Sequence, residues 1–199
     1  MTTLATRPVL ADTFWETTES GIWIKRVALL VAGVLALTIA AKLKVPMWPV
    51  PITMGTFAVL AIGTAYGPAL GLSTILVYLA VGAFGLDVFA GNSAGTTGLT
   101  YMMGTTGGYL VGYALAATAL GWFARKGWDR DIKWMALALL VGNAIIYVPG
   151  LLWLGQVVGW DKPVLAWGLW PFLIGDGLKL VLAALVIPGL WKLVGDARA

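Results

Sequence analysis

Two ionisable residues, Asp176 and Lys179, lie within a long apolar stretch of the sequence. Between residues 165 and 191 they are the only charged side chains. A spacing of three residues places both on one face of a helix, where they can pair. Gly175 and Gly177 flank the aspartate and leave space for another backbone or a ligand. Charge inside a membrane is costly and usually functional, so this pair predicts either ligand contact or a structural ion pair between helices.

A second polar pair, Asn143 and Tyr147, is four residues apart in an earlier apolar stretch and shares one helical face. A buried asparagine amide needs hydrogen-bond partners, so Asn143 either ties helices together or contacts a polar group of a ligand. Asn92 lies in a glycine-rich segment and either reaches the same site or serves a turn. Several aromatic residues fit either an apolar pocket wall or the membrane interface: Trp48, Phe89, Tyr101, Trp153 and Trp170.

The chain contains no histidine and no cysteine. Histidine is the commonest general base and metal ligand, so we expect no catalytic residue, no metal site and no cofactor. An intramembrane enzyme that uses Asp176 as a base is a weaker alternative, because no second carboxylate accompanies it. The sequence also has no Gly-x-x-x-x-Gly-Lys-Ser/Thr run, which excludes ATP hydrolysis by a P-loop in this chain.

Composition indicates a protein that lies almost entirely within the membrane. Of 199 residues, 60% are hydrophobic and 11% are charged, whereas soluble domains have about 25% charged residues. We predict an all-α protein with six transmembrane helices, at residues 22–41, 53–66, 69–84, 108–124, 134–154 and 166–194. The second and third are separated by Gly67 and Pro68, which favours two helices joined by a tight turn over one kinked helix.

The distribution of basic residues predicts the orientation. Nine lie on the side of the termini (Arg7, Lys25, Arg26, Arg125, Lys126, Arg130, Lys133, Lys192 and Arg198) and three on the other (Lys42, Lys44 and Lys162). The positive-inside rule places both termini in the cytoplasm, which explains the net charge of +4 without a nucleic-acid partner. We therefore expect a cytoplasmic extension at residues 1–21, a membrane domain at 22–194 and a cytoplasmic tail at 195–199.

Three loops then meet outside: a proline-rich loop after residue 42, a glycine-rich segment at residues 85–107, and residues 155–165. Three prolines within six positions make the first an ordered, extended loop. The second is too glycine-rich for a helix and too apolar for a solvated linker, which predicts a lid or pocket wall. The loops and the Asp176–Lys179 pair together predict an outward-facing small-molecule site.

Small residues recur every fourth position in the first predicted helix, at Ala28, Ala32, Ala36 and Ala40. A face of this kind allows another helix to approach closely. Alanine is also common in membrane helices generally, so packing is one of two interpretations.

Seven ordered stretches resemble the BioY family, the biotin-specific substrate-binding (S) components of energy-coupling factor (ECF) transporters. They include GNAIIY at residues 142–147 and PFLIGDGLK at residues 171–179. The others lie at residues 50–60, 67–71, 78–91, 104–112 and 153. Together they span nearly everything from residue 22 to residue 194.

The resemblance implies an S-component-like six-helix bundle in a bacterial cytoplasmic membrane, with ordered outer loops, that captures biotin from outside. It implies substrate contacts by Asp176, Lys179, Asn143, Tyr147 and Asn92, with Phe89, Trp153 and Trp48 as further candidates. It also implies docking of Ala28, Ala32 and Ala36 on a transmembrane coupling subunit, which works with two ATPase subunits.

The chain departs from the family pattern at one point. Many members read Gly-Pro-Thr-Gly-Gly-Tyr where residues 104–109 read Gly-Thr-Thr-Gly-Gly-Tyr. No basic residue lies between Gly85 and Tyr109, so we expect no carboxylate clamp from that loop. An S component for another vitamin and a small secondary carrier are the alternative functions.

Overall fold

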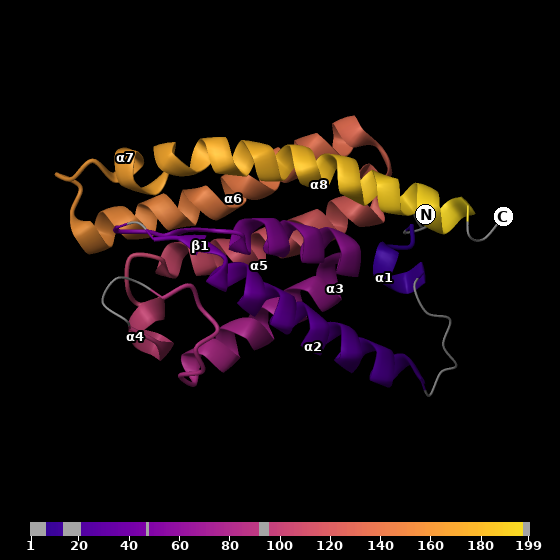
Figure 1. The fold of residues 1–199 in the computed structure, drawn as a ribbon, viewed down its shortest axis with the longest axis horizontal. Coiled ribbons are helices and arrows are strands. Elements are labelled where there is room, and N and C mark those ends of the chain that lie inside the picture. The colour runs from indigo at the N-terminus through magenta and orange to yellow at the C-terminus, as the bar shows by residue number, and fades with distance from the viewer. Residues whose placement is uncertain (1–6, 14–20, 47, 92–95, 197–199) are drawn as a thin grey trace, which may run out of the picture.

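The computed structural model describes residues 7–13, 21–46, 48–91 and 96–196, which form an elongated helical bundle (Figure 1). The helices are α1 (Leu10–Thr13), α2 (Gly21–Lys42), α3 (Gly55–Ala83), α4 (Gly98–Met102), α5 (Gly107–Arg125), α6 (Ile132–Val158), α7 (Val164–Gly168) and α8 (Trp170–Asp196), with a 3-10 turn, η1, at Trp128–Arg130. Two short strands, β1 (Lys44–Val45) and β2 (Ile52–Thr53), pair antiparallel in the proline-rich loop. The predicted all-α class is confirmed, and this loop is extended as expected.

Among the described residues, five stretches are long and apolar enough to cross a membrane. They are α2, α3, α5, α6 and the stretch Val164–Gly195, which contains α7 and α8. The count is lower than six because α3 includes both residues 53–66 and residues 69–84 almost completely.

Helix α3 is broken at the predicted position. Gly67 has φ 78° and ψ 177°, outside the helical region, and Pro68 follows it. The two arms then fold against each other, because a Cβ added to Gly71 would lie 3.3 Å from the Cα of Gly63. In one continuous helix these residues would be separated by about 12 Å of axial rise. The Gly-Pro dipeptide therefore reverses the chain.

The last predicted helix begins differently from the expectation. We predicted helix throughout residues 166–194, but Leu169 has φ −128° and ψ −63° and separates α7 from α8. Proline is well suited to the first turn of a helix, where its missing N–H is not needed, and Pro171 is the second residue of α8. Pro171 therefore marks the start of α8, and the position of Asp176 is counted from there.

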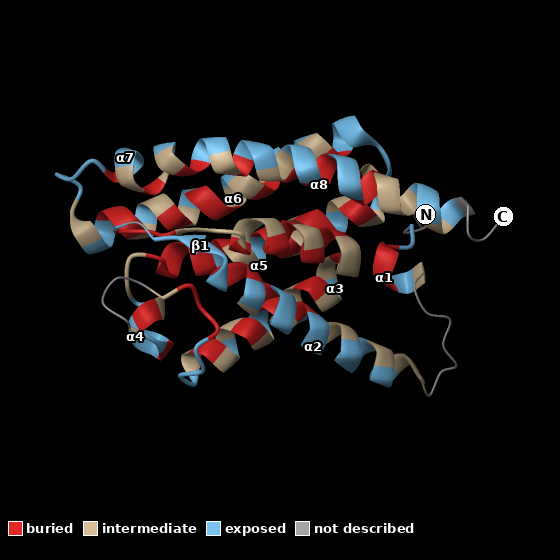
Figure 2. Cartoon of the chain, in the orientation of Figure 1, coloured by how far each residue is buried: buried red, intermediate tan, exposed pale blue. Residues whose placement is uncertain are grey.

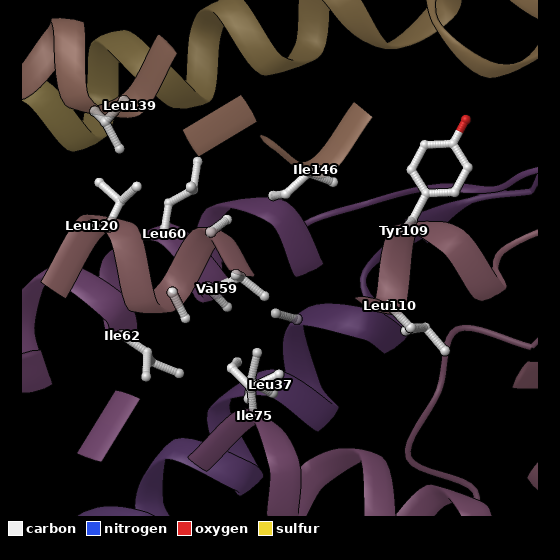
Figure 3. Close-up of a cluster of buried hydrophobic side chains, with 14 of the residues drawn as sticks. Leu37, Val59, Leu60, Ile62, Ile75, Tyr109, Leu110, Leu120, Leu139 and Ile146 are labelled. Atoms are coloured by element: carbon white, nitrogen blue, oxygen red, sulfur yellow. The ribbon is translucent and has the colours of Figure 1, made fainter. Parts of the chain in front are cut away.

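Helix α5 is the centre of the bundle and packs against α3 and α6. Its buried face is rich in small residues, so backbones approach closely. A Cβ on Gly112 would lie 2.7 Å from the Cα of Ile146 in α6, and one on Gly121 would lie 2.3 Å from the backbone nitrogen of Pro68. Figure 2 shows α5 largely buried, and Figure 3 shows the apolar side chains around it.

Helix α2 lies obliquely across the bundle and packs mainly on α3 (Figure 1). Ala40 is buried, whereas Ala28, Ala32 and Ala36 are exposed together with larger apolar neighbours such as Val31 and Leu35. Most of the predicted small-residue face is therefore unpartnered within this chain.

The two ends of the bundle differ. β1, α4 and α7 gather at one end, and the described ends of the chain lie at the other (Figure 1). At that second end, residues 7–13 pack on the bundle: Val9 and Leu10 are buried, and Arg125 forms an ion pair with Asp12 at 2.6 Å. The extension predicted at residues 1–21 thus contains a docked segment.

A buried acid lies near this docked segment, in the turn between α5 and α6. Asp129 is fully buried, and its Oδ2 accepts a hydrogen bond from Trp191 Nε1 at 2.6 Å. Its Oδ1 has no hydrogen-bond partner in the part of the chain that the structure describes. Burial raises the pKa of Asp129, and the hydrogen bond from Trp191 and the charges of Arg130 and Arg7 partly offset this effect.

We expect this pKa to make stability depend on pH. A folded-state pKa above the unfolded value of about 3.9 means that the folded protein binds the proton more tightly. Protonation of Asp129 therefore stabilises the fold at pH values below the unfolded-state pKa. This stabilisation is lost as the pH rises through the folded-state pKa. We expect the thermal midpoint of Asp129→Asn, relative to that of the wild type, to be higher at pH 7 than at pH 4. The neighbouring Asp131→Asn controls for loss of one negative charge, and parallel profiles for wild type and Asp129→Asn would contradict the prediction.

Candidate functional site

A narrow cavity lies among α2, α3, α5, α6, α8 and the loops at the end of the bundle that carries β1. Its free volume is about 50 Å³, smaller than the roughly 300–1,000 Å³ of typical ligand sites. Its lining is mostly aromatic and apolar, with five polar side chains that are not aromatic: Thr53, Thr56, Thr106, Asp176 and Lys179. Its walls have to separate to admit a ligand larger than a few water molecules.

The predicted pair on α8 is the polar centre of this cavity. Lys179 Nζ lies 2.9 Å from Asp176 Oδ1, and the two side chains are 13% and 7% exposed, respectively. Tyr147 in α6 donates a hydrogen bond to Asp176 Oδ2 at 2.5 Å. Thr56 at the start of α3 donates to Oδ1 at 3.3 Å. Three helices therefore meet at one carboxylate.

All three ammonium protons of Lys179 are engaged in hydrogen bonds, whereas Asp176 keeps one acceptor position that no described residue uses. The ammonium has three protons, and it donates to Thr53 O at 2.6 Å, to Thr56 Oγ1 at 3.2 Å and to Asp176. A carboxylate offers about four acceptor positions, and three hydrogen bonds from described residues reach Asp176. The cluster can therefore accept one more donor at Asp176 without breaking an existing hydrogen bond.

Local structure explains why Thr53 and Thr56 reach α8. The β1–β2 pairing holds Thr53 opposite Lys44. The backbone N–H of Gly55 then donates to Thr53 Oγ1 at 3.0 Å as α3 begins. This turn points the carbonyl of Thr53 and the hydroxyl of Thr56 at Lys179. The proline-rich loop thus helps to build the polar site.

The glycine-rich segment supplies an aromatic wall. Phe89 is 3% exposed, stacks on Tyr101 with ring centroids 5.1 Å apart, and meets the edge of Tyr78 at 5.3 Å. Its ring occupies the space beside Gly82, where an added Cβ would lie 2.1 Å from it. Phe89, Ala90 and Tyr101 all line the cavity. The segment predicted to be a lid or pocket wall thus contributes to that wall.

Three of the predicted aromatic residues lie outside the cavity lining. Trp170 is exposed at the start of α8, and the other two contact the surrounding loops. Trp153 donates from Nε1 to the carbonyl of Gly104 at 2.8 Å and so fixes the glycine-rich segment to α6. Trp48 is 62% exposed on the rim, where its ring meets Trp167 of α7 edge-on at 5.0 Å. Both support the loops around the cavity in this structure.

Of the two asparagines predicted to contact the ligand, the structure describes only Asn143. Asn143 lies behind the ion pair, in a smaller cavity that it shares with Asp176 and Lys179. Its Oδ1 has no hydrogen-bond partner among the described residues. Asn92 lies outside the described residues, so its predicted contact with the ligand stays a prediction.

Several lining residues were not singled out from the sequence: Thr53, Thr56, Tyr78, Tyr109 and Tyr113. Tyr109 and Tyr113 are four residues apart, and this spacing places both on one face of α5. That spacing was the available signal. The threonines gave none, because their role depends on the fold of the loop.

Comparisons with known proteins agree with this architecture. The sequence profile described as the BioY family matches residues 10–196. The probable biotin transporter BioY of Pyrococcus horikoshii is 34% identical over 162 residues, which cover 81% of this chain and 93% of that protein. The biotin transporter BioY of Thermotoga maritima is 34% identical over 167 residues, covering 83% and 96%.

A solved structure gives the same result for the fold. The crystal structure of the S-component for biotin from an ECF-type ABC transporter superposes with a TM-score of 0.73. The match covers 89% of this chain and 95% of that one at 23% identity. The bundle therefore has the S-component fold. With the profile matched over nearly its whole length and relatives at one-third identity, the chain belongs to the BioY family.

Proposed function

We propose that this protein captures biotin at the outer face of a bacterial cytoplasmic membrane and takes part in its uptake. The observation that carries the proposal is the buried Asp176–Lys179–Tyr147–Thr56 cluster, which lies in the wall of an aromatic cavity. The relatives named biotin transporters support the choice of ligand.

The chemistry of the cluster suits a ureido group. Such a group presents two N–H donors and one carbonyl acceptor. Asp176 accepts one of the N–H donors at its remaining acceptor position, while the aromatic wall of Phe89, Tyr101 and Phe172 contacts the apolar ring system. An interaction between Lys179 and the ureido oxygen requires Lys179 to release one present acceptor, such as the carbonyl of Thr53.

We further propose six membrane crossings with both termini in the cytoplasm. The reversal at Gly67 supports counting the two arms of α3 as separate crossings. The excess of basic residues at the end of the bundle that carries α1 supports its cytoplasmic placement. The cavity then opens toward the outside, where biotin is encountered.

Energy for uptake is proposed to come from partner subunits. The sequence has no P-loop, so two ATPase subunits, linked to this chain through an ECF coupling subunit, would hydrolyse ATP. Ala28, Ala32 and Ala36 form an exposed face on α2, and close helix approach over small residues makes this face the proposed docking surface for the coupling subunit.

Competition binding tests the choice of ligand. Ligand-free protein in detergent is titrated with labelled biotin in the presence of unlabelled biotin, thiamine or riboflavin. We expect saturable one-to-one binding that only biotin displaces. Displacement by thiamine or riboflavin would assign another vitamin. Absence of tight binding, with flux through liposomes that contain this protein alone, would instead indicate a secondary carrier.

Removing the hydroxyl of Tyr147 should weaken binding without removing it. Tyr147→Phe deletes one hydrogen bond to the charged Asp176, an interaction worth about 1.5–3 kcal/mol. We therefore expect biotin affinity to fall about tenfold or more in equilibrium titrations. Tyr66→Phe is the matched control, because its hydroxyl donates to Leu29 O outside the cavity. An equal loss in both variants would contradict a role for Tyr147 in the site.

A further inference from the structure

Biotin has a polar group at each end, and the cluster around Asp176 accounts for only one of them. The end opposite the ureido ring is a carboxylate on a flexible aliphatic chain. A carboxylate taken into a site of this kind needs a cation or several hydrogen-bond donors. The glycine-rich segment from residue 85 to residue 109 contains no basic residue that could supply the cation.

Lys179 is poorly placed for this second role. Its three protons are directed at Thr53, Thr56 and Asp176, and its charge is already matched by the aspartate at 2.9 Å. Binding a second carboxylate there would place two like charges at one site and break an existing hydrogen bond. The carboxylate of biotin therefore needs a different cation.

Another part of the cavity wall is formed by Phe89 and Ala90, and two lysines, Lys42 at the end of α2 and Lys44 in β1, donate hydrogen bonds to it. Lys42 Nζ donates to Phe89 O at 2.7 Å and forms an ion pair with Asp87 at 2.5 Å. Lys44 Nζ donates to Ala90 O. Phe89 and Ala90 both line the cavity, whereas Lys42 and Lys44 do not, so the two ammonium groups contact the backbone of lining residues without being part of the lining.

Lys44 differs from the other lysines at this end in having no acidic partner among the described residues. Lys42 pairs with Asp87, Lys162 with Asp161 at 3.0 Å and Lys179 with Asp176. Among the described residues Lys44 makes one hydrogen bond, to a neutral carbonyl, so two of its three protons have no acceptor there. Gly91 beside it carries no side chain, and a Cβ there would lie 3.5 Å from Lys44 Nζ.

The β1–β2 pairing relates this cation to the polar cluster. Lys44 lies directly opposite Thr53, and the carbonyl of Thr53 accepts from Lys179. One strand pair thus sets Lys179 at the α8 wall and Lys44 at the wall of the glycine-rich segment. The Asp176–Lys179 pair and Lys44 thus offer two separate polar positions to a ligand with a polar group at each end.

We propose that Lys44 binds the carboxylate of the valerate chain of biotin and so discriminates the free acid from its neutral derivatives. The proposal rests on the proposed function, because it takes biotin as the ligand. Lys42, whose charge is balanced by Asp87, has a different role in this assignment: it holds the wall in position through its hydrogen bond to Phe89 O.

The test compares biotin with biotin methyl ester, which keeps the ring system and loses the charge. We expect the wild type to bind biotin more tightly than the ester. Lys44→Gln should reduce that preference by about ten- to a hundredfold, since a hydrogen-bonded charge is lost, while affinity for the ester changes little. Lys44→Arg should retain the preference. The glutamine can still donate to Ala90 O, and thermal midpoints check that each variant is folded.

Lys42→Gln is the matched control for loosening of the wall. It breaks the ion pair with Asp87 and should weaken biotin and the ester by the same factor. An unchanged preference in Lys44→Gln, an equal loss for both ligands, or a wild type that binds both equally would overturn the assignment and leave biotin as the ligand. A wild type that binds neither would overturn the proposed function as well.

Discussion

Asp176→Asn is expected to lower biotin affinity by about a hundred- to a thousandfold, the largest effect of any single change in the site. Asp176 accepts from Lys179, Thr56 and Tyr147, and its remaining acceptor position is the proposed ureido contact. The substitution leaves Lys179 as a buried charge without a counterion, a situation that typically costs about 3–5 kcal/mol. Equilibrium titration of the purified variant with labelled biotin measures the loss.

A double variant separates binding from folding. Asp176→Leu combined with Lys179→Met removes both charges, and apolar replacement of a whole buried pair is often neutral for stability. We expect its thermal midpoint to lie near that of the wild type while biotin binding stays lost. Asp161→Asn breaks the exposed pair with Lys162 and should leave binding intact. Wild-type affinity in Asp176→Asn would remove this cluster from the site.

Gly121→Val is expected to produce the largest loss of stability away from the cavity. Its Cβ would lie 2.3 Å from the nitrogen of Pro68 and 2.4 Å from the carbonyl carbon of Gly67. These are backbone atoms of the turn inside α3, and they cannot rotate away as a side chain would. Overpacking of this kind costs about 3 kcal/mol, which lowers the thermal midpoint by roughly 5–10 °C in a chain of this length.

The same substitution at an open position is the control. Gly189 in α8 has no atom within 4 Å of its would-be Cβ, so Gly189→Val should leave the thermal midpoint unchanged or slightly higher. Gly121 lies more than two turns along α5 from the cavity-lining Tyr113. Folded Gly121→Val should therefore bind biotin normally at low temperature. Equal midpoints for the two variants would contradict the proposed backbone contact between α5 and α3.

Much of the fold follows from local sequence. The apolar stretches, the break at Gly67 and Pro68 and the extended proline-rich loop depend on propensities that act within a few residues. The break before α8 was missed although Pro171 signals it, because apolar residues on both sides of the break continue a helical pattern. The central position of α5 depends on contacts with α3 and α6, which no local pattern reports.

The site could be predicted only where charge stands out against an apolar background. Asp176 and Lys179 were conspicuous for that reason, and Tyr147 shared the helical face of another polar residue. The contributions of Thr53 and Thr56 arise from the β1–β2 pairing and the start of α3, so they follow from tertiary structure. Trp153 is a case in which residue type misleads. An aromatic side chain suits a pocket wall, but this indole N–H donates to the backbone carbonyl of Gly104.

Capture of biotin by the protein as it is made in cells can be measured directly. The most direct test purifies it in detergent without added ligand, denatures it and assays the released small molecules for biotin. The proposed function predicts biotin at close to one molecule per chain. Absence of biotin, with no binding when biotin is added back to the folded protein, would contradict it.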